Sequence, residues 1–382
     1  MEYTKLKYIN QYKSESINPA KTPDTIFEMY SVPIYETGHP EYLRGDEIAS
    51  NKTVVQKNDI LLCKINPRIN RVWVVSDESD KQNIASSEWI VIRNNEYNSE
   101  FLAWYFRTPK FQKLMMSEVT GIGGSLTRAQ PKCVAEYPVP IIDRKKQDEI
   151  VDVLNKCKFI IDSRQKELLE LDDLIKARFV EMFENNAEYD KFRLEEIADI
   201  VSGITKGRKT KCGELREVPY MAVSNVKDGY IDWRTVKTIL ATEDEITQYK
   251  LLPGDVLMTE GGDPDKLGRG AIIFLPPKDC IHQNHIFRVR LDETRILPRY
   301  FVAYLQSPQA KTYFLRAAKQ TTGIASINMR QLRGLPTIMP PIEQQLEYVL
   351  FSEQIDKSKV AVQKALEETQ VLFDSLMQQY FG

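Results

Sequence analysis

Residues 144–186 read RKKQDEIVDVLNKCKFIIDSRQKELLELDDLIKARFVEMFENN and contain neither glycine nor proline. A stretch of this length without a helix breaker predicts one long helix. Apolar residues recur within it at alternating steps of four and three, with Arg164 and Arg178 in two of the expected positions. This spacing is the pattern of a coiled-coil seam, so the helix should pack against a partner helix. The apolar seam residues are Ile150, Leu154, Cys157, Ile161, Leu168, Leu171, Ile175 and Met182.

A second stretch of this kind occupies residues 342–381 and also lacks glycine and proline. A shift of 198 residues, which places Gln147 on Gln345, aligns the two stretches without a gap. Either stretch taken alone would fit an ordinary bundle helix. Two matching helices half a chain apart indicate instead that the domain before each helix is duplicated as well. The same shift matches Pro138 with Pro336, Gln165 with Gln363, Leu168 with Leu366 and Phe183 with Phe381.

The composition is that of a globular protein with more than one domain, since the chain has 382 residues, of which 42% are hydrophobic and 28% charged. It begins with a polar segment and contains no apolar run long enough to span a bilayer, so we expect a cytoplasmic protein without membrane association. Five scattered cysteines favour reduced thiols over a disulfide framework or a zinc site. The net charge of −2 argues against coating nucleic acid by bulk electrostatics, but local basic loops remain compatible with it.

Both halves of the chain repeat the same order of predicted elements. Short apolar strands such as NDILLCKI and GDVLMTE come first, followed by a pair of short helices broken at Pro109 or Pro308. A glycine-containing loop, TGIGGSLTRAQ or TTGIASINMRQ, and a proline-rich lead-in precede each long helix. The predicted fold class is therefore α+β, with two homologous, mainly β modules. The expected domains are 1–143 and 186–341 for the modules, and 144–185 and 342–382 for the long helices.

Signatures of catalysis are missing from the sequence. The stretch nearest to a phosphate-binding loop, residues 203–210, has the wrong spacing and includes Arg208. Nucleophile-elbow, zinc and dinucleotide-binding patterns are absent. Of the three histidines, His282 and His285 have no third metal ligand nearby in sequence. We therefore expect a protein that is not an enzyme and that binds neither a metal nor a cofactor of its own.

Polar loops at matching positions of the two modules are the candidate functional residues. Arginine and asparagine can form paired hydrogen bonds with base edges, and lysine neutralises phosphates. Solvated hairpin tips are the alternative interpretation of each loop taken alone. The candidates are Lys64, Asn66, Arg68, Asn70 and Arg71 in the first module, and Lys206, Arg208, Lys209, Lys211, Asp263, Lys266 and Arg269 in the second.

The two glycine-containing loops supply a further set of candidates. Their hydroxyl groups and backbone N–H groups are suited to phosphate oxygens, although a plain helix-to-strand connection explains them equally well. The residues concerned are Thr120, Ser125 and Arg128 in the first loop, and Thr322 and Ser326 in the second.

This duplicated order resembles the specificity subunits of type I restriction-modification systems, as do the strings GGDPDKLGRGAI, CIHQNHIFRVRL and LPTIMPPIEQQ. The resemblance covers nearly the whole chain. In one detail the first module departs from it, because Ile142 and Asp143 stand where Pro340 and Pro341 occur in the second.

The resemblance implies two target recognition domains that each read half of a split, asymmetric site in double-stranded DNA. It also implies that the long helices pair antiparallel, as a spacer and as a docking surface for methyltransferase subunits. Those partners would methylate adenine with S-adenosylmethionine, and translocating restriction subunits are an optional addition. Candidate partner contacts on the first long helix are Lys166, Glu167, Glu170 and Asp173, although a solvated helix face explains such charges as well. The alternative function is a non-catalytic coiled-coil scaffold whose β modules bind proteins.

Overall fold

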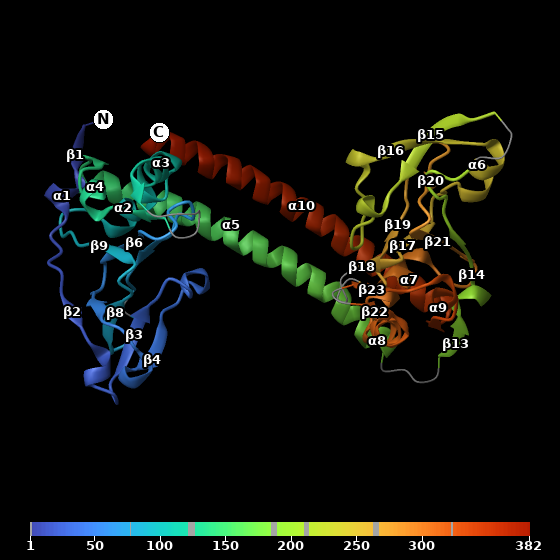
Figure 1. Cartoon of the computed structure of the whole chain (residues 1–382), viewed down its shortest axis with the longest axis horizontal. Coiled ribbons are helices and arrows are strands. Elements are labelled where there is room, and N and C mark those ends of the chain that lie inside the picture. The colour runs from blue at the N-terminus through green and yellow to red at the C-terminus, as the bar shows by residue number, and fades with distance from the viewer. Residues whose placement is uncertain are drawn as a thin grey trace. The chain divides into compact units, whose positions relative to one another are not determined.

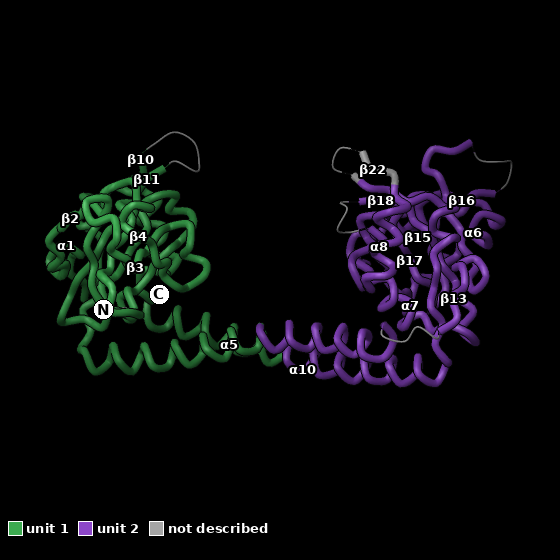
Figure 2. The backbone as a smooth tube through the Cα atoms, turned by 90° about the horizontal axis from the view of Figure 1, so that it is seen from below, with its two compact units in different colours: residues 1–165, 364–382 green, residues 166–363 purple. Residues whose placement is uncertain are grey.

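A computed structural model describes residues 2–76, 78–120, 127–184, 189–209, 214–262, 267–321 and 324–382 of the chain (Figure 1). The chain forms two compact units, residues 1–165 with 364–382, and residues 166–363 (Figure 2). Each unit contains one mainly β module and segments of both long helices. The α+β class with two long helices, predicted from the sequence, is confirmed.

The first module is built around strands that the sequence marks as short apolar runs. Its helical pair breaks where proline was expected to break it, because Pro109 starts the second helix and Thr108 caps it. The elements are β1 (Tyr3–Lys5), α1 (Leu6–Ile9), β2 (Ser16–Ile17), η1 (Pro19–Lys21), β3 (Ile26–Tyr30), η2 (Tyr35–Thr37), β4 (Glu41–Arg44), η3 (Gly45–Glu47), β5 (Lys52–Val54), β6 (Ile60–Cys63), β7 (Val72–Val74), β8 (Gln82–Ala85), β9 (Trp89–Ile92), α2 (Ser99–Phe106), α3 (Pro109–Ser117), β10 (Val119–Thr120), β11 (Arg128–Ala129), α4 (Pro131–Val134) and β12 (Pro138–Pro140).

The second module repeats this order, with Ser307 and Pro308 in the places of Thr108 and Pro109. Its elements are β13 (Asp190–Arg193), η5 (Leu194–Glu196), β14 (Ala198–Ser202), β15 (Arg216–Met221), η6 (Val223–Asn225), η7 (Trp233–Thr235), β16 (Lys237–Ala241), α6 (Glu243–Tyr249), β17 (Val256–Thr259), β18 (Gly261–Gly262), β19 (Gly270–Ile272), β20 (Ile281–His282), β21 (Ile286–Leu291), α7 (Pro298–Leu305), α8 (Pro308–Ala317), β22 (Lys319–Thr321), β23 (Ile324–Ser326), α9 (Met329–Arg333) and β24 (Pro336–Met339).

Matching sheets form the two modules. In the first, a sheet of order β7-β6-β9 stands beside one of order β2-β5-β8-β3-β4, and β1 pairs with β12. In the second, the corresponding sheets have the orders β14-β21-β17-β19 and β16-β15-β20, and β13 pairs with β24. A parallel pair lies at the same place in both, β3 with β8 and β15 with β20. The duplication inferred from the long helices therefore extends to the strand pairing.

The first long helix comprises α5 (Arg144–Phe179) and a π-helical end, η4 (Val180–Glu184), and the second is α10 (Ile342–Phe381). Burial follows the predicted seam, since Ile150, Leu154 and Ile161 are buried. Within residues 166–363 the helices run antiparallel, because Arg178 pairs with Glu347 at 2.6 Å and Asp172 pairs with Lys359.

One glutamine at the start of each long helix joins that helix to its module. The Gln147 side-chain oxygen accepts a hydrogen bond from the backbone N–H of Asn98 at 2.8 Å, and its amide donates to the Ile142 carbonyl. Gln345 repeats the arrangement with the N–H of Leu297 at 2.9 Å. Both glutamines are at most 2% exposed, so each satisfies backbone groups at a helix start that water does not reach.

The far ends of the long helices complete the module cores. Phe381, near the end of α10, is 2% exposed and packs against Phe101 and Tyr105 of the first module at ring-centroid distances of 5.4 and 5.9 Å. Phe183, its counterpart in η4, lies 5.0 Å from Tyr300 in the core of the second module. Each module core is therefore closed by the start of one long helix and the end of the other.

Truncating Phe381 tests this closure. Phe381→Ala removes a buried aromatic ring and should destabilise the first module by about 3–5 kcal/mol, because a cavity replaces it. Tryptophan fluorescence during denaturant unfolding follows this module through Trp73, Trp89 and Trp104, which are three of the four tryptophans; the fourth, Trp233, lies in the second module.

The matched control is Val371→Ala on the same helix, at a side chain that is 69% exposed. It should change stability by no more than about 0.5 kcal/mol. Equal stability of the Phe381 and Val371 variants would show that the helix end does not complete the core.

Candidate nucleic-acid interface

The first candidate loop, residues 64–71, joins β6 to β7 and is fastened along its length. The Asn66 backbone N–H donates to the Thr127 carbonyl at 2.8 Å, and Asn66 adopts a φ of +47°. The carbonyl of Arg68 accepts from the Gln112 side chain at 2.6 Å. The Asn70 amide donates to the Phe106 carbonyl at 3.2 Å. The end of α2, the start of α3 and β11 thus hold one backbone shape for this loop.

Of the five polar side chains in this loop, some bond to the module and others are exposed. Lys64 donates to the Ser87 carbonyl at 2.6 Å, so both Lys64 and Asn70 have bonds within the module. Arg71 is half-buried. Arg68 is exposed, and its Nε donates to the Asn66 side-chain oxygen at 3.3 Å. Arg68 is therefore the member of this loop best placed to reach a ligand.

Paired strands flank the described parts of both glycine-containing segments, a pairing that the sequence did not reveal. In the first module Thr120 and Arg128 are strand residues that pair across β10 and β11. Arg128 makes a two-pronged ion pair with Glu88, at 3.1 and 3.2 Å, and Gln130 donates to the Thr120 hydroxyl. Strand pairing prevails because backbone groups on both sides of the turn satisfy each other. Ser125 lies outside the described residues.

The second module builds the same hairpin beside its own loop. Gly261 pairs with Ser326 across β18 and β23, and β23 pairs with β22. Gly268, at φ +78°, lies so close to Phe314 that a Cβ would stand 2.4 Å from the ring, so no side chain fits there. Arg269 follows it and is half-buried. The candidates Asp263, Lys266 and Thr322 lie outside the described residues.

The basic run of the second module is divided by the fold. Arg208 makes a two-pronged ion pair with Glu245 of α6, at 2.7 and 2.5 Å, and donates to the Leu240 carbonyl. The hydrogen bonds that Arg208 donates to the Glu245 carboxylate raise the pKa of Arg208 above its ordinary value. Lys206 and Lys209 are exposed, and Lys211 is not among the described residues. Arg208 therefore braces its own module, whereas the two lysines point outward.

Sequence inspection did not propose three polar residues beside the hairpins as ligand contacts, namely Glu88, Glu260 and His285. His285 Nδ1 donates to the Glu260 carboxylate at 2.5 Å, where the side chains are 58% and 37% exposed. Polar residues beside apolar strands, as in EWIVI and HIFRV, are common in any sequence. Their position alone therefore does not mark these residues as functional.

In each module an ion pair that crosses neighbouring strands stiffens the sheet behind the loop. Arg93 and Asp59 form two hydrogen bonds at 2.7 and 2.6 Å, and Arg290 and Asp255 repeat them at 2.7 and 2.9 Å. Both aspartates are 1% exposed. Such charges are stable in the interior because each has a bidentate partner.

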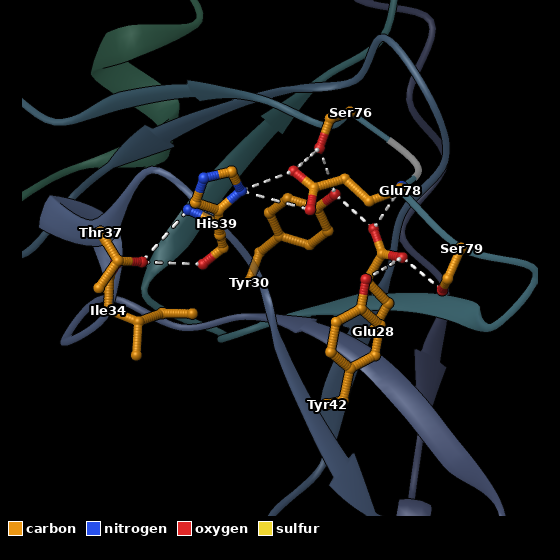
Figure 3. Close-up of polar contacts among 9 residues, drawn as sticks. All are labelled: Glu28, Tyr30, Ile34, Thr37, His39, Tyr42, Ser76, Glu78 and Ser79. Atoms are coloured by element: carbon orange, nitrogen blue, oxygen red, sulfur yellow. Dashed lines mark hydrogen bonds and ion pairs between the residues drawn. The ribbon is translucent and has the colours of Figure 1, made fainter.

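The buried carboxylate of Glu28 binds several hydrogen-bond donors in the first module (Figure 3). Glu28 is fully buried and accepts hydrogen bonds from the Tyr30 hydroxyl at 2.7 Å, the Ser79 hydroxyl at 2.6 Å and the Glu78 backbone N–H at 3.0 Å. Burial alone would raise the pKa of Glu28, but these donors outweigh it and the pKa is lowered. His39, in the loop between η2 and β4, places its Nδ1 3.2 Å from the Glu78 carboxylate. The cluster fixes the chain after β7, at the opposite end of that strand from residues 64–71.

Within each unit, the hairpins and the long-helix segments lie on different sides of the module. Figure 2 shows β10 and β11 of the first unit, and β18 of the second, on the side turned away from that unit's helix segments. One surface of each module is therefore available to a ligand while the helices remain available to another partner.

Comparisons with known proteins agree with this geometry. Residues 186–369 match the family described as type I restriction modification DNA specificity domain. The chain is 22% identical over 306 residues to the type I restriction enzyme EcoKI specificity subunit of Escherichia coli K12, a match that covers 74% of this chain and 65% of that protein. The StySPI specificity subunit of Salmonella potsdam is 21% identical over 322 residues, covering 75% and 65%. The chain thus spans slightly less than two thirds of these relatives.

Solved structures share the fold along the whole chain. One, reported for complex assembly and conformational transition of the type I R-M system, has a TM-score of 0.63 at 19% identity and covers 100% of this chain and 97% of its own. The type I S subunit from M. genitalium has a TM-score of 0.57 at 13% identity, with coverages of 100% and 96%.

The fold, two mainly β modules that are each followed by a long helix, is the one shared with these two solved structures. The chain is similar to the specificity subunits of type I restriction enzymes, and its residues 186–369 match the DNA specificity domain of that family. None of the helices in the described ranges has the length and apolar character needed to cross a membrane.

Neutralising Glu28 tests the brace in the first module. Glu28→Gln replaces one acceptor oxygen by a donor and should cost about 1–3 kcal/mol at pH 7, because donors of Tyr30 and Ser79 lose a partner. Since the folded pKa of Glu28 is lowered, its ionisation stabilises the fold above the unfolded value of about 4.3. That contribution is lost as the pH falls through the folded pKa.

The difference between wild type and variant should therefore shrink in acid. Unfolding curves followed by tryptophan fluorescence at pH 7 and at acid pH measure it. Glu78→Gln is the control, since that carboxylate is one-third exposed and its loss should matter little. A difference that grew toward low pH would contradict the assignment.

Proposed function

We propose that this chain is the DNA sequence-specificity subunit of a type I restriction-modification complex. It binds a bipartite, asymmetric site in double-stranded DNA, and each module contacts one half. The observation that carries the proposal is that one scaffold occurs twice with different polar loops on it. Proteins place recognition residues on loops that a rigid scaffold supports, so two unlike loops on like scaffolds serve two unlike targets.

Arg68 is the clearest candidate for base contact. Its guanidinium is exposed on a loop whose backbone is held by α2, α3 and β11. A held backbone lowers the entropy lost on binding, and a guanidinium can donate two hydrogen bonds to guanine O6 and N7. Lys206 and Lys209 supply exposed positive charge on the second module for the phosphate backbone.

The long helices dock the partner subunits in this proposal. The predicted contacts Lys166, Glu170 and Asp173 are exposed, and Lys166 pairs with Glu170 at 3.4 Å within the helix. Two leucines on the same stretch, Leu169 and Leu174, are 66% and 45% exposed. Apolar side chains exposed among charges support burial by another protein.

The proposed partners are adenine methyltransferase subunits, with restriction subunits as a further addition. S-adenosylmethionine would bind to the methyltransferase and not to this chain, and the complex would act in the cytoplasm. The chain's own residues then bind and orient DNA, and the methyl transfer takes place on the partner.

Exchange of one module tests the assignment of half-sites. Replacing residues 186–340 by the equivalent module of a relative should change one half of the methylated motif and leave the other half intact. Sequencing that detects methylated adenines in cells expressing the complex measures both halves at once. A simultaneous change in both halves would contradict independent modules.

Arg68→Ala tests the first module within the complex. It should weaken binding by about 1–3 kcal/mol and relax one position of the motif, because a base contact discriminates among bases. Binding of duplexes that vary one base at a time, at fixed salt, measures this.

The control is Arg44→Ala in the same module, where the guanidinium is exposed and pairs with Asp24 and Asp46. It should leave the motif unchanged. Loss of affinity that is equal for all sequences would instead assign Arg68 to a phosphate.

A further inference from the structure

We call residues 64–71 of the first module, and the loop that follows β17 in the second, the recognition loops. The first residue of each makes the same backbone hydrogen bonds. In the first, the Lys64 N–H donates to the Glu88 carbonyl at 3.0 Å, and the Ala129 N–H donates to the Lys64 carbonyl at 2.9 Å. In the second, the Glu260 N–H donates to the His285 carbonyl at 3.0 Å, and the Ile327 N–H donates to the Glu260 carbonyl at 2.8 Å. These bonds make Lys64 equivalent to Glu260 and Glu88 equivalent to His285.

Because Ala129 corresponds to Ile327, the preceding residues Arg128 and Ser326 also correspond. Three side chains thus occupy equivalent places, and we call them the loop-base triads. The first triad is Lys64, Glu88 and Arg128, and the second is Glu260, His285 and Ser326.

The two triads have different charges on the same backbone. In the first, two cations accompany one carboxylate, and Arg128 covers Glu88 with two hydrogen bonds. In the second, a carboxylate occupies the lysine position and its partner is an imidazole. Ser326 replaces the arginine, so no guanidinium covers the Glu260 carboxylate from that side.

A carboxylate at this place is unfavourable beside DNA phosphates unless it meets a hydrogen-bond donor. Only the exocyclic amino groups of cytosine and adenine offer donors in the major groove. Glu260 is 37% exposed, and its Oε2 is held at 2.5 Å by His285 Nδ1. Within the described part of the chain no residue bonds Oε1, so this oxygen can accept a further hydrogen bond. A fixed carboxylate of this kind accepts from an amino group at low entropic cost.

We propose that Glu260 reads an exocyclic base amino group, cytosine N4 or adenine N6, in the half-site of the second module, and that His285 positions the carboxylate. The first module does not recognise a base amino group in this way, because Lys64 stands at the equivalent position. This inference rests on the proposed function and adds a specificity determinant at the base of the loop in the second module.

The test uses the chain in complex with its cognate methyltransferase subunits. Glu260→Gln keeps the shape of the side chain and exchanges one acceptor for a donor. Methylation of duplexes that vary each base in turn should fall roughly 5- to 150-fold for the preferred base at one position of the second half-site. The base lost at that position identifies cytosine or adenine as the source of the amino group.

His285→Ala should weaken preference at the same position by a smaller factor, since the carboxylate remains but is no longer held. The matched control is His39→Ala, which removes a histidine from a similar pair with Glu78 at 3.2 Å (Figure 3). That pair lies on the far side of β7 from the recognition loop, so all positions of the motif should stay unchanged.

A second variant keeps the test decisive if Glu260→Gln folds poorly. Glu260→Lys combined with His285→Glu and Ser326→Arg installs the first triad, whose ion pair already fits this backbone in the first module. It should fold and lose the original base preference at the same position.

The results separate the two levels of the argument. If Glu260→Gln leaves every position unchanged, lowers methylation equally for all sequences, or alters only the first half-site, the role of Glu260 is overturned. If the wild-type complex shows no sequence-specific modification, the proposed function itself fails.

Discussion

The closure of each module by the end of a long helix is the interaction on which the structure depends. Phe183 and Phe381 place their rings among aromatic residues of the module cores, where both are at most 2% exposed. A module without its helix end would expose these cores to water, at a cost of several kcal/mol for each ring. The strands of the first module and the last residues of the chain therefore form one cooperative unit.

Repeated polar braces give the recognition loops a constant foundation. Gln147 and Gln345 satisfy backbone groups at the helix starts, and the Asp59–Arg93 and Asp255–Arg290 pairs tie neighbouring strands. A buried polar group is costly to leave without its hydrogen-bond partner. These pairs therefore keep the backbone the same in both modules, while exposed residues can differ. The loop-base triads illustrate this, since identical backbone bonds carry opposite charges at positions 64 and 260.

The sequence by itself determined the duplication, the fold class and the long helices. The absence of glycine and proline, the steps of four and three, and the matched Phe183 and Phe381 are local or periodic signals that survive without coordinates. The seam residues Ile150, Leu154 and Ile161 are buried as their spacing predicted. The polar loop of residues 64–71 was also visible, because a cluster of long polar side chains between apolar strands is a contiguous pattern.

Tertiary structure decided which of those side chains remain available. Arg208 looked like its lysine neighbours in sequence, yet Glu245, 37 residues later, takes both prongs of its guanidinium. The glycine segments became hairpins through pairing of strands on either side of the turn. Glu260 and His285 stand 25 residues apart and meet only because β17 and β21 are neighbours. Hydrogen bonds and ion pairs depend on distances of about 3 Å, which the packing of strands sets and the linear order of residues does not.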